Sequence, residues 1–269
     1  MSVSNFASLT NTLLPAVLEA GRVQMAYYES GVDVERKADA SPVTAADQEA
    51  EIILVKALAA AAPSIAVIAE ESSAAGSFAT TGDEFFLVDP LDGTKEFIKK
   101  NGDFTINIGL IRNGKPVYGL VYAPAMSQLY VTLGDGHAIE TALAPSSTVQ
   151  TLDECQTSRL RTRTPPSAGL TALESRSHRS PATEEFLKTL PINEVRAAGS
   201  SIKFCLIARG EADLYPRIGP TCEWDTAAAH AVLNASGGAV LKVDGSELIY
   251  GKAADKYLNP HFVAWGRKP

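Results

Sequence analysis

The chain has 269 residues, of which 45% are hydrophobic and 20% are charged, and its formal net charge is -7 at pH 7. This length and composition predict a globular protein with one large domain or two halves that share an interface. The negative charge argues against a general nucleic-acid binder, because such proteins usually present a basic surface. Local basic residues can still bind a small anion.

Cysteine usage and the absence of long apolar runs indicate the compartment. Cys155, Cys205 and Cys222 are odd in number and have no C-x-x-C spacing, which argues against a disulfide framework or a zinc site and favours a reducing environment. The sequence shows neither a basic region before an N-terminal apolar run nor a continuous apolar stretch of membrane-spanning length. We therefore expect a cytoplasmic protein without an integral membrane segment, while peripheral membrane association stays open.

The N-terminal part begins with two helical patterns. Apolar residues recur at helical spacing over residues 6–28, with Pro15 as the weak point. Residues 37–44 are polar and predict a loop. Thr44 and Asp47 then match a capping box at the start of a second helix, which Pro63 ends. A short apolar run over residues 65–69 predicts a strand that ends at two acids, Glu70 and Glu71.

The stretch at residues 85–97 is the most informative part of the sequence. Four apolar residues, 85–88, predict a buried strand, and Pro90 and Gly93 predict a turn directly after it. Asp89 and Asp92 would then lie at the end of the strand, close enough to share a hard cation. An ordinary turn of Asp, Pro and Gly is the alternative, because these residues are common in turns.

The next segments predict an antiparallel sheet. Residues 104–110 alternate at strand period, residues 112–115 read as a hairpin turn, and strands follow at 117–122 and 128–133. Residues 144–168 are rich in Ser, Thr, Pro and Arg and suggest a boundary. We expect an α+β half at residues 1–150 and an α/β half at residues 151–269.

The second half alternates between predicted strands and helices. Strands are expected near residues 170–174, 194–197 and 212–215, and a last strand is expected to begin at Ala239. Helices are expected after Pro181, over residues 200–209, and over residues 226–235, where glycines follow the helix.

Four acids stand at the ends of predicted elements: Glu70, Asp89, Asp92 and Asp225. Each alone has a plain explanation, such as a solvated loop acid or a helix cap. If they converge, their mutual repulsion requires cations or protons. An oxygen-only set without a His/Cys cluster suits Mg²⁺ better than zinc.

One rival interpretation of the D-P-L-D-G-T segment concerns haloacid-dehalogenase-type phosphatases. Those enzymes place a nucleophilic Asp and an acid Asp two residues apart, whereas Asp89 and Asp92 are three apart. The spacing argues against a phospho-aspartate mechanism and favours direct attack by water activated at a metal site.

Three signatures together resemble the Mg²⁺-dependent phosphatase superfamily of inositol monophosphatases and fructose bisphosphatases. They are A-E-E at 69–71, D-P-L-D-G-T at 89–94 and W-D-T-A-A at 224–228. They follow the family's order over essentially the whole chain. The resemblance implies a layered α/β/α/β/α sandwich with the metal site between the halves, and inhibition by Li⁺.

Further segments resemble the CysQ-type 3'(2'),5'-bisphosphate nucleotidases. These segments are residues 41–47, Lys95-Glu96, and residues 175–178, 199–206 and 214–217. The implied substrate is adenosine 3',5'-bisphosphate, which would lose its 3'-phosphate to give AMP. An inositol monophosphatase is the rival within the superfamily, and a non-catalytic nucleotide or metal sensor is the rival of another class. Whether the chain is a monomer or a homodimer stays open.

The resemblance also implies residue roles. Two or three Mg²⁺ ions would be held by Glu70, Asp89, Asp92, Asp225 and the Leu91 carbonyl, and Glu71 would assist a third ion. Thr94 paired with Asp47 would orient and deprotonate the attacking water, while the Gly93 and Thr94 amides would bind the scissile phosphate. The nucleotide would contact a hydroxyl and three nitrogen-bearing side chains, Ser200, His178, Lys203 and Arg217.

Overall fold

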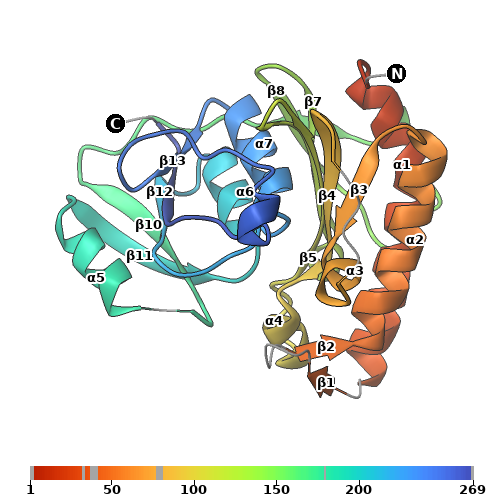
Figure 1. Ribbon diagram of the computed structural model, residues 1–269. Helices are drawn as coiled ribbons and strands as arrows, with labels where there is room; N and C mark the ends of the chain where they lie inside the picture. Colours follow the sequence, from red (N-terminus) through yellow and green to blue (C-terminus); the bar gives the residue numbers. More distant parts are fainter. Residues whose placement is uncertain (1–2, 32–33, 37–41, 77–80, 179, 268–269) are drawn as a thin grey trace.

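The molecule is built from five layers of secondary structure. The computed structural model describes residues 3–31, 34–36, 42–76, 81–178 and 180–267, and the side chains of residues 34–36, 42 and 43 are outside the description. Figure 1 shows the order of the layers, with long helices on one side, then the large sheet, the central helices, the smaller sheet and an outer helix. This is the predicted α/β/α/β/α sandwich, and the fold prediction is confirmed.

The larger sheet has seven strands in sequential order. Its first pair, β3 and β4, is parallel, and all later neighbours are antiparallel. The strands are β3 (Ala66–Ala69), β4 (Glu84–Asp92), β5 (Thr105–Arg112), β6 (Lys115–Ala123), β7 (Gln128–Gly134), β8 (His137–Ala142) and β9 (Thr157–Arg159). Asn113 and Gly114 have φ of 50° and 73°, which suits the tight turn predicted between β5 and β6.

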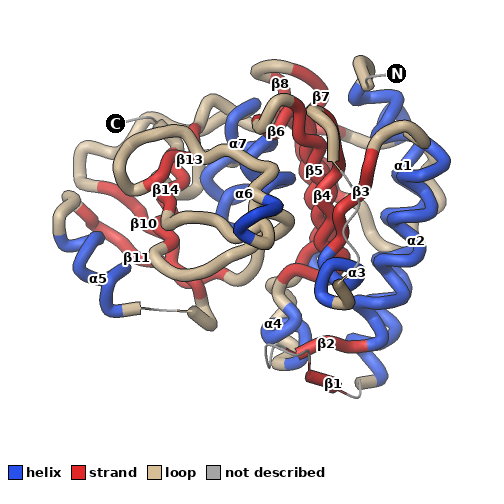
Figure 2. Tube along the Cα trace, viewed as in Figure 1, coloured by secondary structure: helices blue, strands red, loops and turns tan. Residues whose placement is uncertain are grey.

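Helices α1 (Phe6–Ser30) and α2 (Ala45–Ala61) cover one face of this sheet (Figure 2). α1 buries one stripe, including Leu13, Leu14 and Val17, whereas Pro15 is exposed and the helix continues through it. α2 begins at the predicted capping box, where the Thr44 backbone N-H donates to Asp47 Oδ2 at 2.8 Å. The apolar faces of both helices join the sheet in one buried cluster.

The smaller sheet has five strands in the order β11-β10-β12-β14-β13. β10 pairs in parallel with β11 and β12, and β14 is antiparallel to β12 and β13. The strands are β10 (Leu170–Ser175), β11 (Ile192–Ala198), β12 (Leu214–Arg217), β13 (Ala239–Lys242) and β14 (Phe262–Trp265). The outer helix α5 (Pro181–Lys188) lies beyond this sheet in Figure 1.

The central layer consists of α6 (Ile202–Ala208) and α7 (Ala227–Ala235), between the two sheets. α7 approaches the larger sheet at two glycines. A Cβ at Gly109 would lie 2.8 Å from the Ala227 Cβ, and one at Gly119 would lie 1.9 Å from the Ala228 carbonyl oxygen. Glycine is therefore required for α7 to lie this close to β5 and β6.

Short elements complete the chain. β1 (Val34–Arg36) pairs with β2 (Pro42–Thr44), and single-turn helices α3 (Glu70–Ala74) and α4 (Thr94–Ile98) follow β3 and β4. Three 3-10 turns are η1 (Pro124–Met126), η2 (Leu152–Glu154) and η3 (Ala253–Asp255). In the part of the chain that the structure describes, no helix is long and apolar enough to cross a membrane.

The structure corrects three predictions of local structure. β4 does not end before Pro90 but continues to Asp92 through a register shift. Residues 42–44 form β2 instead of a loop, while residues 37–41 lie outside the described part. β13 is not the last strand, because β14 follows it and is inserted beside β12. The division of the chain at residue 150 stays a prediction.

Replacing Gly119 by Ala should lower the free energy of unfolding by at least about 2 kcal/mol, because the added methyl would meet backbone that cannot rotate away. Urea denaturation measures the effect. Gly134→Ala is the control, since nothing lies within 4 Å of its Cβ position. Equal stability of the two variants would show that α7 does not pack as described.

His230 predicts a pH dependence of stability. Burial lowers its pKa to about 3, and its Nδ1 lies 2.9 Å from the Tyr250 hydroxyl. Below the unfolded-state pKa of about 6.5 the unfolded chain takes up a proton that the folded chain does not, so stability is lost as the pH falls. From pH 6.5 to 5, the wild type should lose about 2 kcal/mol more than His230→Gln in urea denaturation. Parallel losses would contradict the buried neutral imidazole.

Candidate functional site

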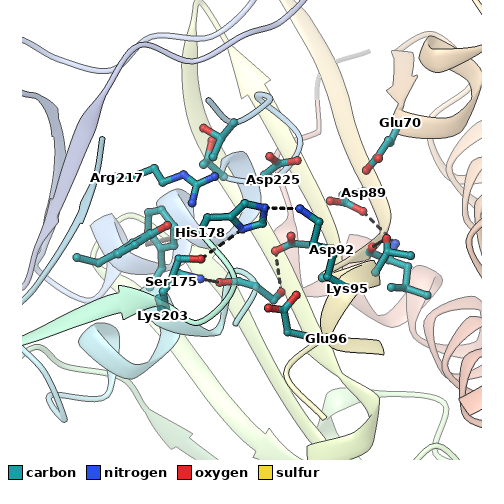
Figure 3. A pocket seen from close by; sticks show the side chains of 18 of the residues that line it. Glu70, Asp89, Asp92, Lys95, Glu96, Ser175, His178, Lys203, Arg217 and Asp225 are labelled. Atoms are coloured by element: carbon teal, nitrogen blue, oxygen red, sulfur yellow. Dashed lines mark hydrogen bonds between the residues drawn. The ribbon is translucent and has the colours of Figure 1, made fainter. Parts of the chain in front are cut away.

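A pocket lies where the larger sheet, the central helices and the smaller sheet meet. Its walls bring together acids mostly from the first half of the chain and basic residues mostly from the second (Figure 3). The predicted site residues that line it are Glu70, Asp89, Leu91, Asp92, Gly93, Thr94, His178, Ser200, Lys203, Arg217 and Asp225. Eleven of the thirteen predicted positions therefore converge, and the other two are Asp47 and Glu71.

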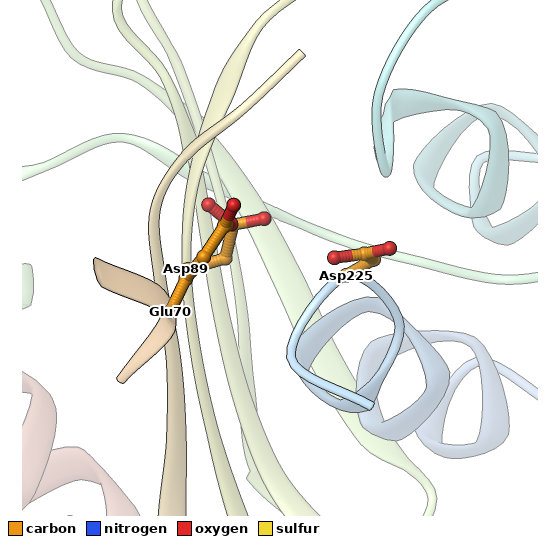
Figure 4. A group of neighbouring side chains, drawn as sticks. All are labelled: Glu70, Asp89 and Asp225. Atoms are coloured by element: carbon orange, nitrogen blue, oxygen red, sulfur yellow. The ribbon is translucent and has the colours of Figure 1, made fainter. Parts of the chain in front are cut away.

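Three carboxylates form a compact group at one end of the pocket, which we call the acidic end. Glu70, Asp89 and Asp225 each offer one oxygen, and these oxygens all lie within 4.8 Å of one another (Figure 4). Glu70 is the first residue of α3, and Asp89 lies within β4. Asp225 comes just before α7, whose N-cap is Thr226, so Asp225 is not the cap.

A β-bulge explains why Asp89 and Asp92 share a side of the strand. Residues three apart in a regular strand point to opposite faces. Here Asp89 pairs with Asn107 and Asp92 pairs with Thr105, so three steps on β4 match two on β5. A bulge can hold Pro90 because a bulged residue does not need a backbone N-H for strand pairing. The Pro90 carbonyl accepts a hydrogen bond from Gln24 Nε2 at 2.6 Å.

Asp92 lines the same pocket but is tied to the second half of the chain. Its Oδ2 accepts hydrogen bonds from the Ser200 hydroxyl at 2.7 Å and the Ser201 backbone N-H at 2.6 Å. Burial raises the pKa of Asp92, and the nearby Lys203 acts in the opposite direction. Its role as a metal ligand stays a prediction.

The acidic end has the chemistry of a hard-cation site. Burial raises the pKa of Asp225 well above its usual value, and the charges of Asp92 and Glu70 raise it further. A bound divalent cation would relieve this repulsion, and an oxygen-only donor set suits Mg²⁺ or Ca²⁺ more than zinc. The carboxylate oxygens of the acidic end are therefore suitable ligands for a divalent metal ion.

The predicted pair of Thr94 and Asp47 is in contact. The Thr94 hydroxyl donates to Asp47 Oδ1 at 3.2 Å, with the Leu91 carbonyl as a second acceptor at 3.4 Å. Asp47 is buried, and its other oxygen accepts from the Thr44 N-H and hydroxyl. The capping box therefore fixes the carboxylate that faces Thr94.

Gly93 gives the chain a sharp turn between β4 and α4. Its φ is 96°, and a Cβ there would lie 2.8 Å from the Asp103 carbonyl oxygen. α4 has only five residues, so phosphate binding here cannot rely on a helix dipole and would depend on single amides. That contact stays a prediction.

Sequence reasoning missed Glu51, which positions α3. This buried residue of α2 accepts hydrogen bonds from the backbone N-H groups of Glu71 at 2.7 Å and Ser72 at 2.9 Å. It thereby holds the first turn that carries Glu70. Its helical spacing of four from Asp47 was the signal available in the sequence.

Opposite the acidic end, four basic side chains form the basic end of the pocket: Lys95, His178, Lys203 and Arg217. Lys203 is buried, its Nζ lies 4.9 Å from the centre of the Tyr215 ring, and burial lowers its pKa to about 8. Arg217 Nη2 donates to the Pro220 carbonyl at 2.7 Å, but its buried Nε has no partner among the described residues. An anion would supply that partner.

His178 is neutral and is embedded among cations. Burial, together with the charges of Arg217 and Lys95, lowers its pKa to about 4. Its Nε2 lies 3.0 Å from Lys95 Nζ, and its Nδ1 lies 3.4 Å from the Ser175 hydroxyl (Figure 3). Because a lysine ammonium only donates, Nε2 accepts and the ring proton is on Nδ1.

Comparison with known proteins identifies the family. The family model described as "Inositol monophosphatase family" matches residues 5–262. The chain belongs to the inositol monophosphatase family. Within this family, the 3'(2'),5'-bisphosphate nucleotidase CysQ of Shigella flexneri is 42% identical over 90% of this chain and 94% of its own length. The corresponding protein of Haemophilus influenzae is 33% identical over 96% of this chain and 93% of its own.

Solved structures of the inositol monophosphatase family agree with this assignment. CysQ from Bacteroides thetaiotaomicron has a TM-score of 0.79 and 35% identity, covering 98% of this chain and 99% of its own. An IMPase from Thermotoga maritima has a TM-score of 0.72 at 21% identity, covering 94% and 90%, and it supports the fold alone.

Asp225→Asn tests the acidic end without an activity assay. The wild type should gain about 2.7 kcal/mol of stability at a divalent-cation concentration 100 times the Kd. Asp225→Asn should lose most of this gain, while its stability in EDTA should equal or exceed that of the wild type because one repulsive charge is gone. Thermal unfolding with MgCl2 and with EDTA measures both effects.

Asp135→Asn is the matched control, because it removes the same charge from an exposed turn. It should keep the full cation-dependent rise in Tm. An equal rise in Asp225→Asn would show that the acidic end holds no cation.

Proposed function

We propose that this chain is a Mg²⁺-dependent 3'(2'),5'-bisphosphate nucleotidase that hydrolyses the 3'-phosphate of adenosine 3',5'-bisphosphate to give AMP and phosphate. The observation that carries the proposal is the polarity of one pocket, with carboxylates at one end and cations at the other. A substrate with two phosphates suits both ends at once. The CysQ relatives, which are 3'(2'),5'-bisphosphate nucleotidases, support this substrate class.

Two or three Mg²⁺ ions would be held by the acidic end, Glu70, Asp89 and Asp225, together with Asp92 and the Leu91 carbonyl. When bound, these ions supply positive charge that offsets the phosphate's negative charge and makes water more acidic. Glu71 is proposed as an assistant to a third ion, and its backbone N-H donates to Glu51.

Thr94 and Asp47 would orient the attacking water and take its proton. A threonine hydroxyl is a weak base, so a carboxylate behind it is required. Asp47 meets this need because two contacts from Thr44 fix one oxygen while the other faces Thr94. The water oxygen then bonds to phosphorus, the bond from phosphorus to the ribose 3'-oxygen breaks, and that oxygen is protonated.

The basic end would bind the phosphate that remains and the nucleoside. Arg217 can bind phosphate through two N-H groups, and Lys203 and Lys95 supply point charges. His178 and Ser200 would contact the nucleotide, with the neutral imidazole of His178 presenting its protonated Nδ1 toward Ser175 in the free protein. We also propose a cytoplasmic location and leave a monomer and a homodimer as alternatives.

The rival within the family is an inositol monophosphatase. Its substrate carries one phosphate and has no second phosphate for the basic end. Phosphate release from adenosine 3',5'-bisphosphate should therefore exceed release from inositol 1-phosphate, and Arg217→Ala should reduce the former much more than the latter. Equal losses on the two substrates would favour the rival, and no release from either would favour a binding protein.

Asp47→Asn should lower kcat by about 10² to 10⁴ while leaving Tm almost unchanged, because an amide oxygen can still accept the Thr44 N-H bond. Single-turnover phosphate release measures the rate. Thr94→Ser is the control that keeps the hydroxyl and should stay active. Unchanged turnover in Asp47→Asn would show that another group takes the proton.

A further inference from the structure

The two ends of the pocket are joined by a short segment, residues 176–178, of which His178 lines the pocket. Arg176, Ser177 and His178 follow β10 in the second half of the chain, and each contacts a residue of the first half. The partners are Asp103, Glu96 and Lys95, in that order. Three consecutive residues are thus fixed by α4 and the loop after it.

Asp103 is the central acceptor in this arrangement. It is buried, and its Oδ2 accepts from Arg176 Nε at 2.9 Å and from the Gly199 backbone N-H at 2.7 Å. One carboxylate oxygen therefore joins the segment that carries His178 to the turn that carries Ser200. Among the described residues Asp103 is not part of the pocket lining, so it acts on a substrate through these two segments and through its charge near Lys203.

Packing at this junction leaves little freedom. A Cβ at Gly199 would lie 2.6 Å from the Asp103 Cβ and 2.7 Å from the Glu96 Cγ. Ser200, the next residue, donates to Asp92, which follows Asp89 on β4 and lines the same pocket, and Lys203 Nζ donates to the Ser200 carbonyl at 2.5 Å. A displacement of this turn would therefore move the basic end relative to the acidic end.

We propose that Asp103 is a positioning residue that fixes the separation between the acidic and basic ends of the pocket, and so selects substrates in which two phosphates occupy both ends. The inference rests on the proposed function. It predicts that loss of the Asp103 contacts weakens binding of the distal phosphate and leaves the chemistry at the proximal phosphate largely intact.

The test compares adenosine 3',5'-bisphosphate with adenosine 3'-monophosphate, which has the same scissile phosphate and lacks the distal one. For the wild type, kcat/KM should favour the bisphosphate. In Asp103→Asn this preference should fall about tenfold or more through a higher KM, with kcat changed little, because small misplacements of binding groups are costly. Arg176→Gln should act in the same direction, and its half-exposed side chain makes a folding defect less of a concern.

Asp213→Asn is the matched control. Asp213 is also buried and also holds an arginine and a backbone amide, since it accepts from Arg163 at 2.7 Å and from the Thr171 N-H at 2.8 Å. It should lower Tm as Asp103→Asn does, yet keep the wild-type preference for the bisphosphate. A purely structural role for Asp103 predicts that both variants behave alike.

The outcomes separate the two proposals. If the wild type hydrolyses neither nucleotide, the proposed function fails. If the wild type prefers the bisphosphate and both Asp103→Asn and Arg176→Gln keep that preference, the function stands and the positioning role of Asp103 is wrong. Inhibition by adenosine 5'-monophosphate gives a second readout, because its Ki should rise in Asp103→Asn and stay constant in Asp213→Asn.

Discussion

Repulsion between buried carboxylates is the constraint around which this pocket is built. Two unit charges at 4.8 Å repel by about 3 kcal/mol at an effective dielectric of 20, and three acids meet at this separation. Hydrogen bonds offset part of this repulsion, such as the one that the Cys222 backbone N-H donates to Asp225. A bound cation would offset the remaining repulsion. Such a cation would also link the two halves of the chain, because its ligands come from both.

The same constraint gives the pocket its polarity. The charge of Lys203 opposes the effect of burial on the pKa of Asp92, and Arg217 and Lys95 add positive charge around His178. A net negative protein thereby concentrates its cations where an anionic substrate enters. Hydrogen bonds from the Ser200 hydroxyl to Asp92 and from the Gly199 N-H to Asp103 connect the two halves and so link the binding groups to the catalytic groups.

Motifs made most of the candidate site predictable from the sequence, because Glu70, Asp89 and Asp92 lie where predicted strands end and Asp225 lies where a predicted helix begins. Local patterns did not reveal the bulge at Pro90, since a bulge depends on pairing with β5. Nor did they reveal β14, because its position beside β12 depends on pairing between residues far apart in the sequence. The role of Asp103 was hidden for the same reason, because its partners are 73 and 96 positions away.

The most direct test of the account is the identity of the product formed from adenosine 3',5'-bisphosphate, followed by ³¹P NMR in the presence of Mg²⁺. The account predicts inorganic phosphate and adenosine 5'-monophosphate, because the phosphate at the acidic end is cleaved and the one at the basic end is retained. Formation of adenosine 3'-monophosphate instead would mean that the substrate binds in the reverse orientation and would contradict the assignment of the two ends.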